Sequence, residues 1–487
     1  MQKKSQKVKI NRILIDCSDT YIENLNTGIQ RVVRNIVSRS AIITEVSGAE
    51  VIPVILDKKR GYVKLSDIRI SNGNKNISKN TKNIAKKLPF KVFLKVIQHI
   101  IRKSKHYLEG LFQIFSAKFY TGADSVIPEE NDVLILTDGF WNYRYNVYFD
   151  NFCKKIKKNN GKVIAVVYDI IPLTNPEFFD IGLTLNLKGK IKKIKGFIDA
   201  VITISKSEKE IIEEYLKKTL NLENTVNKPV KYFYPGCDIK CGIDSENSVK
   251  YQDGKENDAS SGGEGGLNLK KIKIRKNLTE IFETHDIHIQ RRFSYISVGT
   301  IEPRKGYDYT IEAFEEMWKN GYRGILVIAG KIGWKTEKLL KKIRRSAYLN
   351  KKLFMFNDLN DNELCYMYKT ADALVSASFR EGYGLPLAEA MNYRLPVLAS
   401  DIPVFREIGA PMGISIGKSA EGAKSKEIIY FNPDKNGLIS AVKEFESRAN
   451  MADGNNPNPA AEAAAVVSWD ESVRNFSSAV VEICGIF

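Results

Sequence analysis

Two glutamates, Glu381 and Glu389, lie eight residues apart in the stretch SFREGYGLPLAEAMNYRLPV (378–397). Gly382, Gly384 and Pro386 stand between them, so the chain is expected to turn after Glu381 and to place Glu389 on the helix that follows. With a rise of 1.5 Å per helical residue, the two carboxylates are roughly 10 Å apart, too far for the pair at ~5 Å in retaining glycosidases. They are better placed to hold two parts of one long ligand.

The glycines of this turn favour an anion between the two carboxylates. Gly382 and Gly384 lack side chains, so their N–H groups and the N-terminus of the helix can approach a diphosphate. A ligand with a polyol, a phosphate and a second polyol in that order has the layout of a nucleotide sugar. The spacing therefore predicts a nucleotide-sugar site in this loop.

A second loop, in GTIEPRKGYDYTIEAFEEM (299–317), places Arg304, Lys305 and Gly306 directly after an apolar segment. An adjacent arginine and lysine can neutralise a leaving diphosphate without a metal ion. The chain contains no D-x-D motif, the usual metal anchor of the other main class of sugar transferases. We therefore expect no metal and no cofactor besides the nucleotide-sugar substrate.

Short apolar strands alternate with helical patterns along both halves of the chain. This alternation builds parallel sheets covered on both faces, and ligands bind beyond the carboxyl ends of such strands. The expected fold is α/β, with two doubly wound, Rossmann-like domains that face a cleft. The predicted strands are 12–17, 51–56, 132–137, 162–167 and 200–204 in the first half, and 293–298, 324–330, 352–356, 372–378 and 395–400 in the second.

The length of 487 residues also favours two domains, because a single hydrophobic core rarely grows that large. A polar segment rich in glycine and serine separates the two series of strands and predicts a flexible loop. The predicted units are an N-terminal domain on the acceptor side (1–243), a linker or loop (244–290), a C-terminal nucleotide-sugar domain (291–465) and a closing helix (466–487).

Several motifs resemble one known family. The order SVGTIEPRKG, ILVIAGK, DNELCYMYKTADALVSASFREGYGLPLAEAM and LPVLASDIPVFREI is similar to the C-terminal domain of family 4 glycosyltransferases of the GT-B fold. The segments TGIQRVVRNI, LTDGFWN, AVVYDIIPLTNPEFF and VITISKSEKEII resemble, more loosely, bacterial mannosyltransferases that build surface polysaccharides. The chain is thus identified as resembling that family, more closely in its C-terminal half.

The resemblance implies a role for each matching residue. Glu381 would bind hydroxyls of the transferred sugar, and Glu389 would bind the ribose. Arg304 and Lys305 would bind the diphosphate. Asp169 matches the aspartate of a His-Asp pair near the reacting carbon, and together with Glu381, Arg304 and Lys305 it forms the expected catalytic set. The other implied contacts with the nucleotide sugar are Gly28, Gly382, Tyr383, Gly384 and Leu385.

The sequence departs from the family pattern at two positions. Tyr168 stands where many relatives have histidine, which argues against a histidine-based mechanism and favours a packing role. Arg394 stands where the family usually has glycine, and a left-handed conformation there would cost about 1 kcal/mol.

Three of the residues singled out also have simpler structural interpretations. Gly28 could serve only as a helix-entry turn, and Asp169 could be the ion-pair partner of a nearby lysine. Ser205, followed by Glu208, has the spacing of a helix N-cap with its capping box, and a contact with the substrate is its second interpretation.

The formal net charge of +18 is concentrated in the first 120 residues, which carry +16 of it. Its densest part, residues 82–118, interleaves lysine and arginine with large apolar residues. This composition suits a helix lying on anionic lipid, whereas the alternative is an insertion that packs on its own domain. No recognition motif accompanies the charge, so nucleic acid is not expected as a partner. With neither a long apolar run nor a signal-peptide pattern, the expected location is the cytoplasmic face of the cell membrane, held peripherally.

Together these observations predict a retaining, metal-independent hexosyltransferase that uses a nucleotide sugar, with mannose from GDP-mannose as the best match. The acceptor would be a lipid-linked oligosaccharide or polysaccharide in bacterial surface glycan synthesis. One alternative keeps the fold but releases a soluble product, as a sugar phosphorylase or sugar-phosphate synthase does. The other is a basic scaffold without catalytic activity that binds lipid or nucleic acid.

Overall fold

The structure is a computed structural model that describes most of the chain. The described residues are 10–22, 27–57, 60–67, 125–138, 147–220, 228–239, 274–283, 292–410, 428–452 and 467–485. The predicted basic insertion at 82–118 lies outside these residues.

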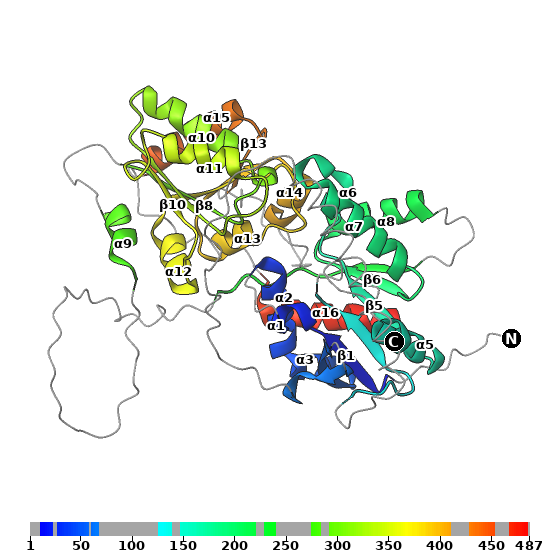
Figure 1. Ribbon diagram of the computed structural model, residues 1–487. Helices are drawn as coiled ribbons and strands as arrows, with labels where there is room; N and C mark the ends of the chain where they lie inside the picture. Colours follow the sequence, from blue (N-terminus) through cyan, green and yellow to red (C-terminus); the bar gives the residue numbers. More distant parts are fainter. Residues whose placement is uncertain are drawn as a thin grey trace, which may run out of the picture.

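The N-terminal half forms a seven-stranded sheet in the order β3-β2-β1-β4-β5-β6-β7 (Figure 1). Every neighbouring pair is parallel except β2 and β3, which pair as an antiparallel edge. The strands are β1 (Arg12–Asp16), β2 (Glu50–Asp57), β3 (Gly61–Lys64), β4 (Val133–Leu136), β5 (Lys162–Val166), β6 (Ala200–Thr203) and β7 (Val230–Tyr232).

Helices follow these strands because apolar residues recur on one helical face. In α2, for example, Val32, Val33 and Ile36 are buried, so one side of the helix packs on the core. The helices of this half are α1 (Ser18–Ile22), α2 (Gly28–Ser38), α3 (Ser40–Ser47), α5 (Val147–Lys158), α6 (Ile171–Thr174), α7 (Ile181–Ile194) and α8 (Lys206–Leu220), with 3₁₀ turns at Leu65–Asp67 and Pro176–Phe178.

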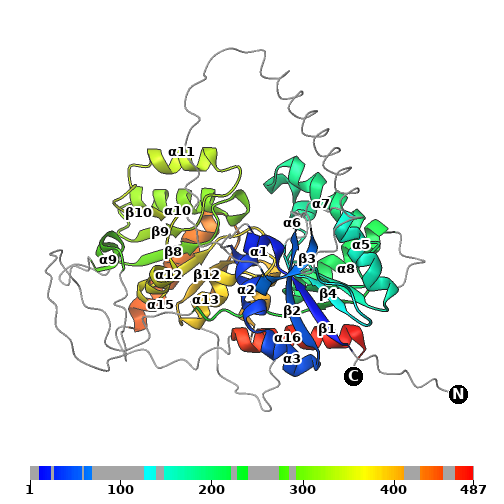
Figure 2. The ribbon, with the colours of Figure 1, turned by 60° about the horizontal axis from the view of Figure 1, so that its bottom comes forward.

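The C-terminal half forms a second, six-stranded parallel sheet in the order β10-β9-β8-β11-β12-β13 (Figure 2). Its strands are β8 (Ser294–Val298), β9 (Ile325–Ala329), β10 (Leu353–Phe356), β11 (Ala373–Ser376), β12 (Val397–Ser400) and β13 (Ile428–Phe431). The helices are α9 (Lys276–Glu283), α10 (Tyr307–Lys319), α11 (Glu337–Arg345), α12 (Asp361–Thr370), α13 (Leu385–Asn392), α14 (Pro403–Gly409), α15 (Lys435–Ala452) and α16 (Trp469–Cys484).

Helix α9 lies inside the segment that the sequence predicted as a linker or loop. Phe282 packs edge-on against Tyr366 of α12, with ring centroids 6.0 Å apart. Arg275, just before α9, pairs with Glu363 of α12 at 2.6 Å. Within the described residues, α9 is therefore part of the C-terminal half.

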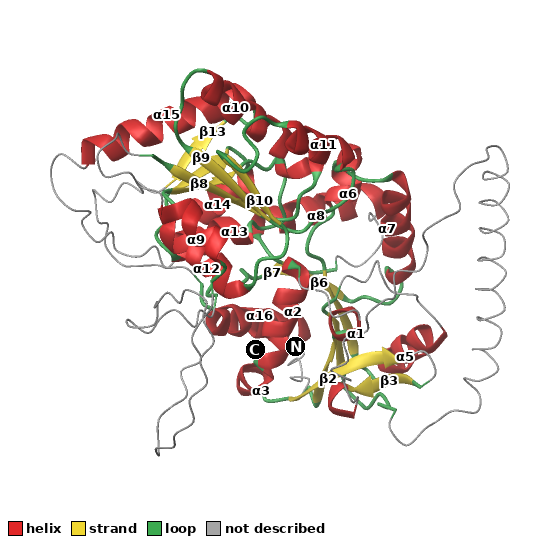
Figure 3. Cartoon of the chain, turned by 60° about the vertical axis from the view of Figure 1, so that its left-hand side comes forward, coloured by secondary structure: helices red, strands yellow, loops and turns green. Residues whose placement is uncertain are grey.

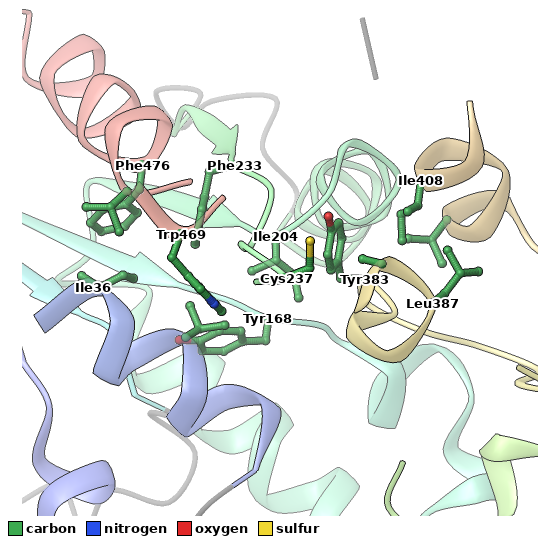
Figure 4. Close-up of a cluster of buried hydrophobic side chains, with 14 of the residues drawn as sticks. Ile36, Tyr168, Ile204, Phe233, Cys237, Tyr383, Leu387, Ile408, Trp469 and Phe476 are labelled. Atoms are coloured by element: carbon green, nitrogen blue, oxygen red, sulfur yellow. The ribbon is translucent and has the colours of Figure 1, made fainter. Parts of the chain in front are cut away.

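The last helix, α16, returns to the N-terminal half, where it contacts α3 and α2 (Figure 3). One buried apolar cluster includes Ile36 and Tyr168 from the first half, Tyr383 from the second, and Trp469 and Phe476 from α16 (Figure 4). The two halves thus share part of their core through this helix.

The structure defines the conformations of Tyr168 and Arg394, the two residues that depart from the family pattern. Tyr168 is buried and its hydroxyl donates to the carbonyl oxygen of Thr137 at 2.7 Å, which is a packing arrangement. Arg394 has a φ of 54°, so this position is left-handed, the conformation in which glycine would be less strained.

Among the residues that the structure describes, none of the helices combines the length and the hydrophobicity needed to cross a bilayer.

Candidate active site

The expected charged residues of the C-terminal half meet beyond the carboxyl ends of β8 and β11. Arg304 and Lys305 occupy a 3₁₀ turn, Pro303–Lys305, after β8, and Glu381 follows β11. Arg304 donates to Glu381 Oε2 at 2.6 Å, and Lys305 pairs with the other carboxylate oxygen. Ser378 also donates to Glu381 Oε1 at 2.6 Å. The structure therefore brings these three predicted residues together in one ion-pair network.

Glu381 is held as a carboxylate in this network. Burial by itself raises the pKa of its side chain, but the charges of Arg304 and Lys305 outweigh burial and lower the pKa to about 2. Its contribution to folding stability is present above the ordinary glutamate pKa and is lost only as the pH falls through about 2. Glu381 consequently stays ionised throughout the neutral and mildly acidic pH range.

A second carboxylate, Glu302, lies on the other side of Arg304. Its Oε1 is 2.6 Å from Arg304 Nε, and the residue is 1% exposed. Burial raises the pKa of Glu302, while Arg304 opposes this rise. Within the described part of the chain neither oxygen of Glu302 has a hydrogen-bond partner, so the contact is an ion pair without hydrogen-bond alignment. Arg304 is thus fixed between two acidic side chains.

The glycine turn is required by close packing between the two halves. A Cβ atom at Gly382 would lie 2.7 Å from the carbonyl oxygen of Tyr168 and 3.1 Å from Cβ of Asp169. Gly384 has a φ of 111°, which side chains rarely adopt, and leads directly into α13. Tyr383 is buried between them and packs against Tyr234, with ring centroids 6.0 Å apart.

Asp169 follows β5 and reaches this turn from the N-terminal half. Its Oδ1 accepts from the backbone N–H of Ile171 at 3.1 Å. Burial raises the pKa of its carboxyl group, and the positive charge of Arg304 acts in the opposite direction. The predicted catalytic aspartate therefore lies beside the predicted sugar-binding loop, within the electrostatic influence of the arginine. Among the residues that the structure describes, no lysine forms an ion pair with Asp169.

Glu389 lies on α13, 2% exposed, and both of its carboxylate oxygens have partners. Tyr368 donates to Oε2 at 2.8 Å, and Arg31 of α2 pairs with Oε1. Burial raises the pKa of Glu389, whereas Arg31 and Tyr368 oppose the rise. Sequence reasoning did not select Arg31. Its only sequence signal is its place three residues after Gly28.

Gly28 begins α2 and faces the C-terminal half. A Cβ atom at this position would lie 3.5 Å from the side chain of Leu385, the first residue of α13. The structure thus brings together Gly28 and the helix N-terminus that the sequence assigned to a diphosphate, although the two lie in different halves of the chain.

Hydrogen bonds of Ser205 and Glu407 hold the N-terminus of α8 against the C-terminal half. Ser205 donates to the carbonyl oxygen of Gly382 at 2.7 Å and accepts from the N–H of Glu208 at 3.0 Å. Glu407 of α14 accepts from the N–H groups of Lys206 and Ser207 at 2.7 and 2.8 Å. Ser205 is therefore an N-cap, as expected, but the predicted capping box is not complete, because the Glu208 side chain bonds elsewhere.

A second contact between the halves is aromatic. Phe179 stacks on Trp334 with ring centroids 5.3 Å apart, and Phe178 stacks on Phe379 at 5.7 Å. The indole N–H of Trp334 also donates to the carbonyl oxygen of Phe178 at 3.0 Å. These contacts join the segment after Asp169 to Trp334, in the loop after β9, and to Phe379, in the loop before Glu381.

The arrangement can bind and stabilise a polyanion next to a fixed carboxylate. Two adjacent cations lie at a helix N-terminus and a glycine turn, a combination that suits phosphate oxygens. In the described ranges, no three histidine, cysteine or acidic side chains are grouped so as to hold a metal ion.

Comparison with known proteins identifies the C-terminal half. Residues 283–417 match the family described as "Glycosyl transferases group 1". The chain is 30% identical over 300 residues to the serotype-specific mannosyltransferase WbdA of Escherichia coli, covering 61% of this chain and 33% of that protein. It is 30% identical over 153 residues to the O-antigen chain mannosyltransferase RfbU of Salmonella typhimurium, covering 31% of this chain and 38% of the relative. The chain thus spans about a third of the length of these curated relatives.

A solved structure supports the fold of the whole chain. The catalytic domain of starch synthase IV from Arabidopsis thaliana, bound to ADP and acarbose, superposes with a TM-score of 0.52 over 98% of this chain and 99% of that one, at 11% identity. Such a likeness establishes the architecture alone. The chain accordingly has the GT-B fold, carries a glycosyl transferases group 1 domain at residues 283–417, and is similar to bacterial mannosyltransferases.

Proposed function

We propose that this protein is a retaining glycosyltransferase that moves mannose from GDP-mannose onto a lipid-linked or polysaccharide acceptor. The observation that carries the proposal is the buried network of Glu381, Arg304 and Lys305, with Asp169 directly across the domain junction. The similarity to mannosyltransferases favours mannose, and the name of RfbU favours a surface glycan as product.

In this proposal each residue has a distinct task. Arg304 and Lys305 stabilise the negative charge that develops on the leaving diphosphate, a role that a bound metal ion has in other sugar transferases. Glu381 fixes both cations and binds sugar hydroxyls. Asp169 faces the reacting carbon from the other domain. Retention follows if the diphosphate leaves on the face that the acceptor attacks, as the family resemblance implies.

A panel of nucleotide sugars tests this function. The preferred substrate should raise the melting temperature, because a ligand at 100 times its Kd adds about 2.7 kcal/mol of stability. Transfer to isolated lipid-linked acceptor should then give an α-linked product from GDP-mannose, with the anomer read by NMR. Absence of transfer from every nucleotide sugar would refute the proposal, and release of a soluble sugar or sugar phosphate would favour the phosphorylase or synthase alternative.

The variant Glu389→Ala tests the assignment of the ribose site. Loss of a charged hydrogen-bond partner costs about 1.5–3 kcal/mol, so we expect the Kd for GDP to rise roughly 10- to 100-fold. The value of kcat at saturating GDP-mannose should change much less, because ribose contacts are equal in the ground and transition states. Calorimetry on Glu389→Ala and on the exposed control Glu337→Ala measures the difference. An unchanged Kd for GDP would show that Glu389 does not bind the ribose.

The proposal includes an anionic membrane surface as a partner of the N-terminal domain. Helix α7 supports this, because Ile181 and Leu185, one helical turn apart, are 78% and 61% exposed. Lys188 and Lys192 continue the same helical face and are exposed as well. Residues 181–195 contain five lysines and no acidic residue. Exposed apolar side chains next to cationic ones are typical of helices that lie on anionic lipid.

Co-sedimentation with liposomes tests this surface. Each lysine near an anionic bilayer contributes about 1 kcal/mol, so Lys188→Glu with Lys192→Glu should lower binding to phosphatidylglycerol vesicles by tenfold or more. The same is expected when Lys86, Lys87, Lys91 and Lys95 of the 82–118 insertion become glutamate.

A matched control changes the same charge elsewhere, with Lys319→Glu and Lys351→Glu, which are exposed residues of the C-terminal domain. The control should bind like the unmodified protein. Equal binding by all variants, or equally strong binding to neutral vesicles, would remove the membrane from the proposal.

A further inference from the structure

Glu208 is a buried acid beside the candidate active site. It lies in the first turn of α8 and is 1% exposed. Its Oε1 accepts from the backbone N–H of Ile170 at 3.0 Å. Ile170 is the residue after Asp169, so Glu208 holds the main chain that carries the predicted catalytic aspartate.

The other carboxylate oxygen of Glu208 has no hydrogen-bond partner among the described residues. The charged groups that act on Glu208 are Asp169, from the segment after β5, and Arg380, from the loop after β11. Arg380 is also incompletely paired, since its Nε atom is buried without a partner in the described part of the chain. The carboxyl groups of Asp169 and Glu208 therefore repel one another when both are ionised, and Arg380 attracts both of them without an ion pair to either among the described residues.

Burial of two like charges at this spot is unfavourable unless one group is neutral. Burial also raises the pKa of Asp169, but the positive charge of Arg304 opposes this rise, so Asp169 is the better candidate for the ionised group. For Glu208, burial and then the negative charge of Asp169 raise the pKa to about 8, and the Ile170 N–H and Arg380 only partly oppose this. Together with the unpartnered Oε2 of Glu208, these effects favour an ionised Asp169 and a neutral Glu208.

We propose that Glu208 is a positioning residue that works as a neutral carboxylic acid, holding the Ile170 main chain so that Asp169 stays against the Gly382 turn. The proposal rests on the proposed role of Asp169 in sugar transfer. When Glu208 ionises, its charge repels the Asp169 carboxylate and competes for Arg380, so Asp169 moves away from the position it needs. The upper pH limit of activity is then set by Glu208.

The variant Glu208→Gln tests the neutral state without any assay of activity. Glutamine has the same size and still accepts from the Ile170 N–H, but it cannot ionise. Between the unfolded glutamate pKa of about 4.3 and the folded pKa of about 8, the folded wild type binds one proton more than the unfolded chain, so its stability falls as the pH rises. The melting temperature of Glu208→Gln minus that of wild type should therefore increase from pH 5 to pH 8 and stay constant above.

Glu210→Gln is the matched control, because Glu210 lies two residues further along α8 and is exposed. Its difference from wild type should not change with pH over the same range. A pH-independent difference for Glu208→Gln would show that Glu208 is ionised in the folded protein and would overturn the proposal. This result would not depend on whether the protein transfers mannose or any other sugar.

The pH profile of kcat supplies the second readout. In the wild type and in Glu208→Asp, which keeps a titrating group, kcat should fall about tenfold per pH unit on the alkaline side, starting near pH 8 for the wild type. In Glu208→Gln that fall should disappear or begin at least one pH unit higher, with kcat at pH 7 within a few fold of wild type.

Two failures can be told apart. If transfer occurs but the profiles of wild type and Glu208→Gln superpose, the positioning role of Glu208 is wrong and the proposed function stands. If no nucleotide sugar is transferred, the proposed function is wrong, while the melting temperatures still decide whether Glu208 is neutral.

Discussion

Replacing Glu381 by alanine should reduce kcat by roughly 10²- to 10³-fold, the range found when a group that stabilises transition-state charge is removed. The carboxylate binds both Arg304 and Lys305 in a buried network, so its loss leaves two cations without their common partner. It also removes the proposed contact with sugar hydroxyls, which strengthens as charge develops at the anomeric carbon. The expected signature is a large loss in kcat with a smaller change in the Kd for GDP-mannose.

Steady-state kinetics and calorimetry on the same preparations separate these two quantities. Glu312→Ala is a suitable control because Glu312 is an exposed acid on α10 of the same domain. The acid limb of the pH profile should not reflect Glu381, whose pKa of about 2 keeps it ionised. Wild-type turnover in Glu381→Ala would show that the sugar lies elsewhere.

Arg304→Ala and Lys305→Ala should each lower kcat by on the order of 10²-fold or more, equivalent to about 2.7–4 kcal/mol of barrier. The two side chains are proposed to stabilise the leaving diphosphate directly, so the activity of the wild type should survive EDTA. Arg304→Lys should recover only part of the loss, because lysine lacks the planar guanidinium group with which Arg304 contacts Glu302 and Glu381 at once.

Initial rates before and after chelation, with and without added Mg²⁺ or Mn²⁺, check this prediction. Lys319→Ala, at the exposed end of α10, serves as the control for loss of a positive charge. Strict dependence on either ion would contradict the assignment of the two side chains to the diphosphate.

Strands were the most predictable part of the fold. All ten predicted strands occur, because continuous apolar runs between polar segments identify buried parallel strands well. Strands β3, β7 and β13 were not predicted. The first is a short antiparallel edge, GYVK, and the second has only three residues, so neither carries a long apolar run. Strand β13 lies beyond the family motifs that helped to identify the other strands of the C-terminal sheet.

The missed helix α9 had a signal that composition obscured. Leu278, Ile281 and Phe282 have helical spacing and are all buried. They follow a long polar stretch, however, and the whole segment was therefore assigned to the linker. Because the composition was judged over the polar stretch and residues 276–283 together, the short amphipathic pattern of α9 was not recognised.

Candidate site residues were predictable where a motif is local. Arg304, Lys305 and Glu381 lie in loops after recognisable strands, so strand topology alone places them at one edge of the sheet. Arg31 could not be found in this way, since it meets a glutamate 358 positions away. The pairing of Glu208 with the Ile170 main chain is similar, because capping statistics predict a local bond and tertiary packing supplies a different one.

The return of α16 to the N-terminal half affects how this protein could be recombined with its relatives. A hybrid that took its C-terminal half from another GT-B protein by a single exchange near residue 240 would also import a foreign final helix. The ring centroids of Phe476 and Phe233 are 5.2 Å apart in an edge-on contact, and the backbone N–H of Cys237 donates to the carbonyl oxygen of Val467 at 3.2 Å. A final helix from another protein would have to reproduce these contacts with the N-terminal half. Functional hybrids should therefore require two crossovers, the second before Val467, so that α16 and the N-terminal half come from the same protein.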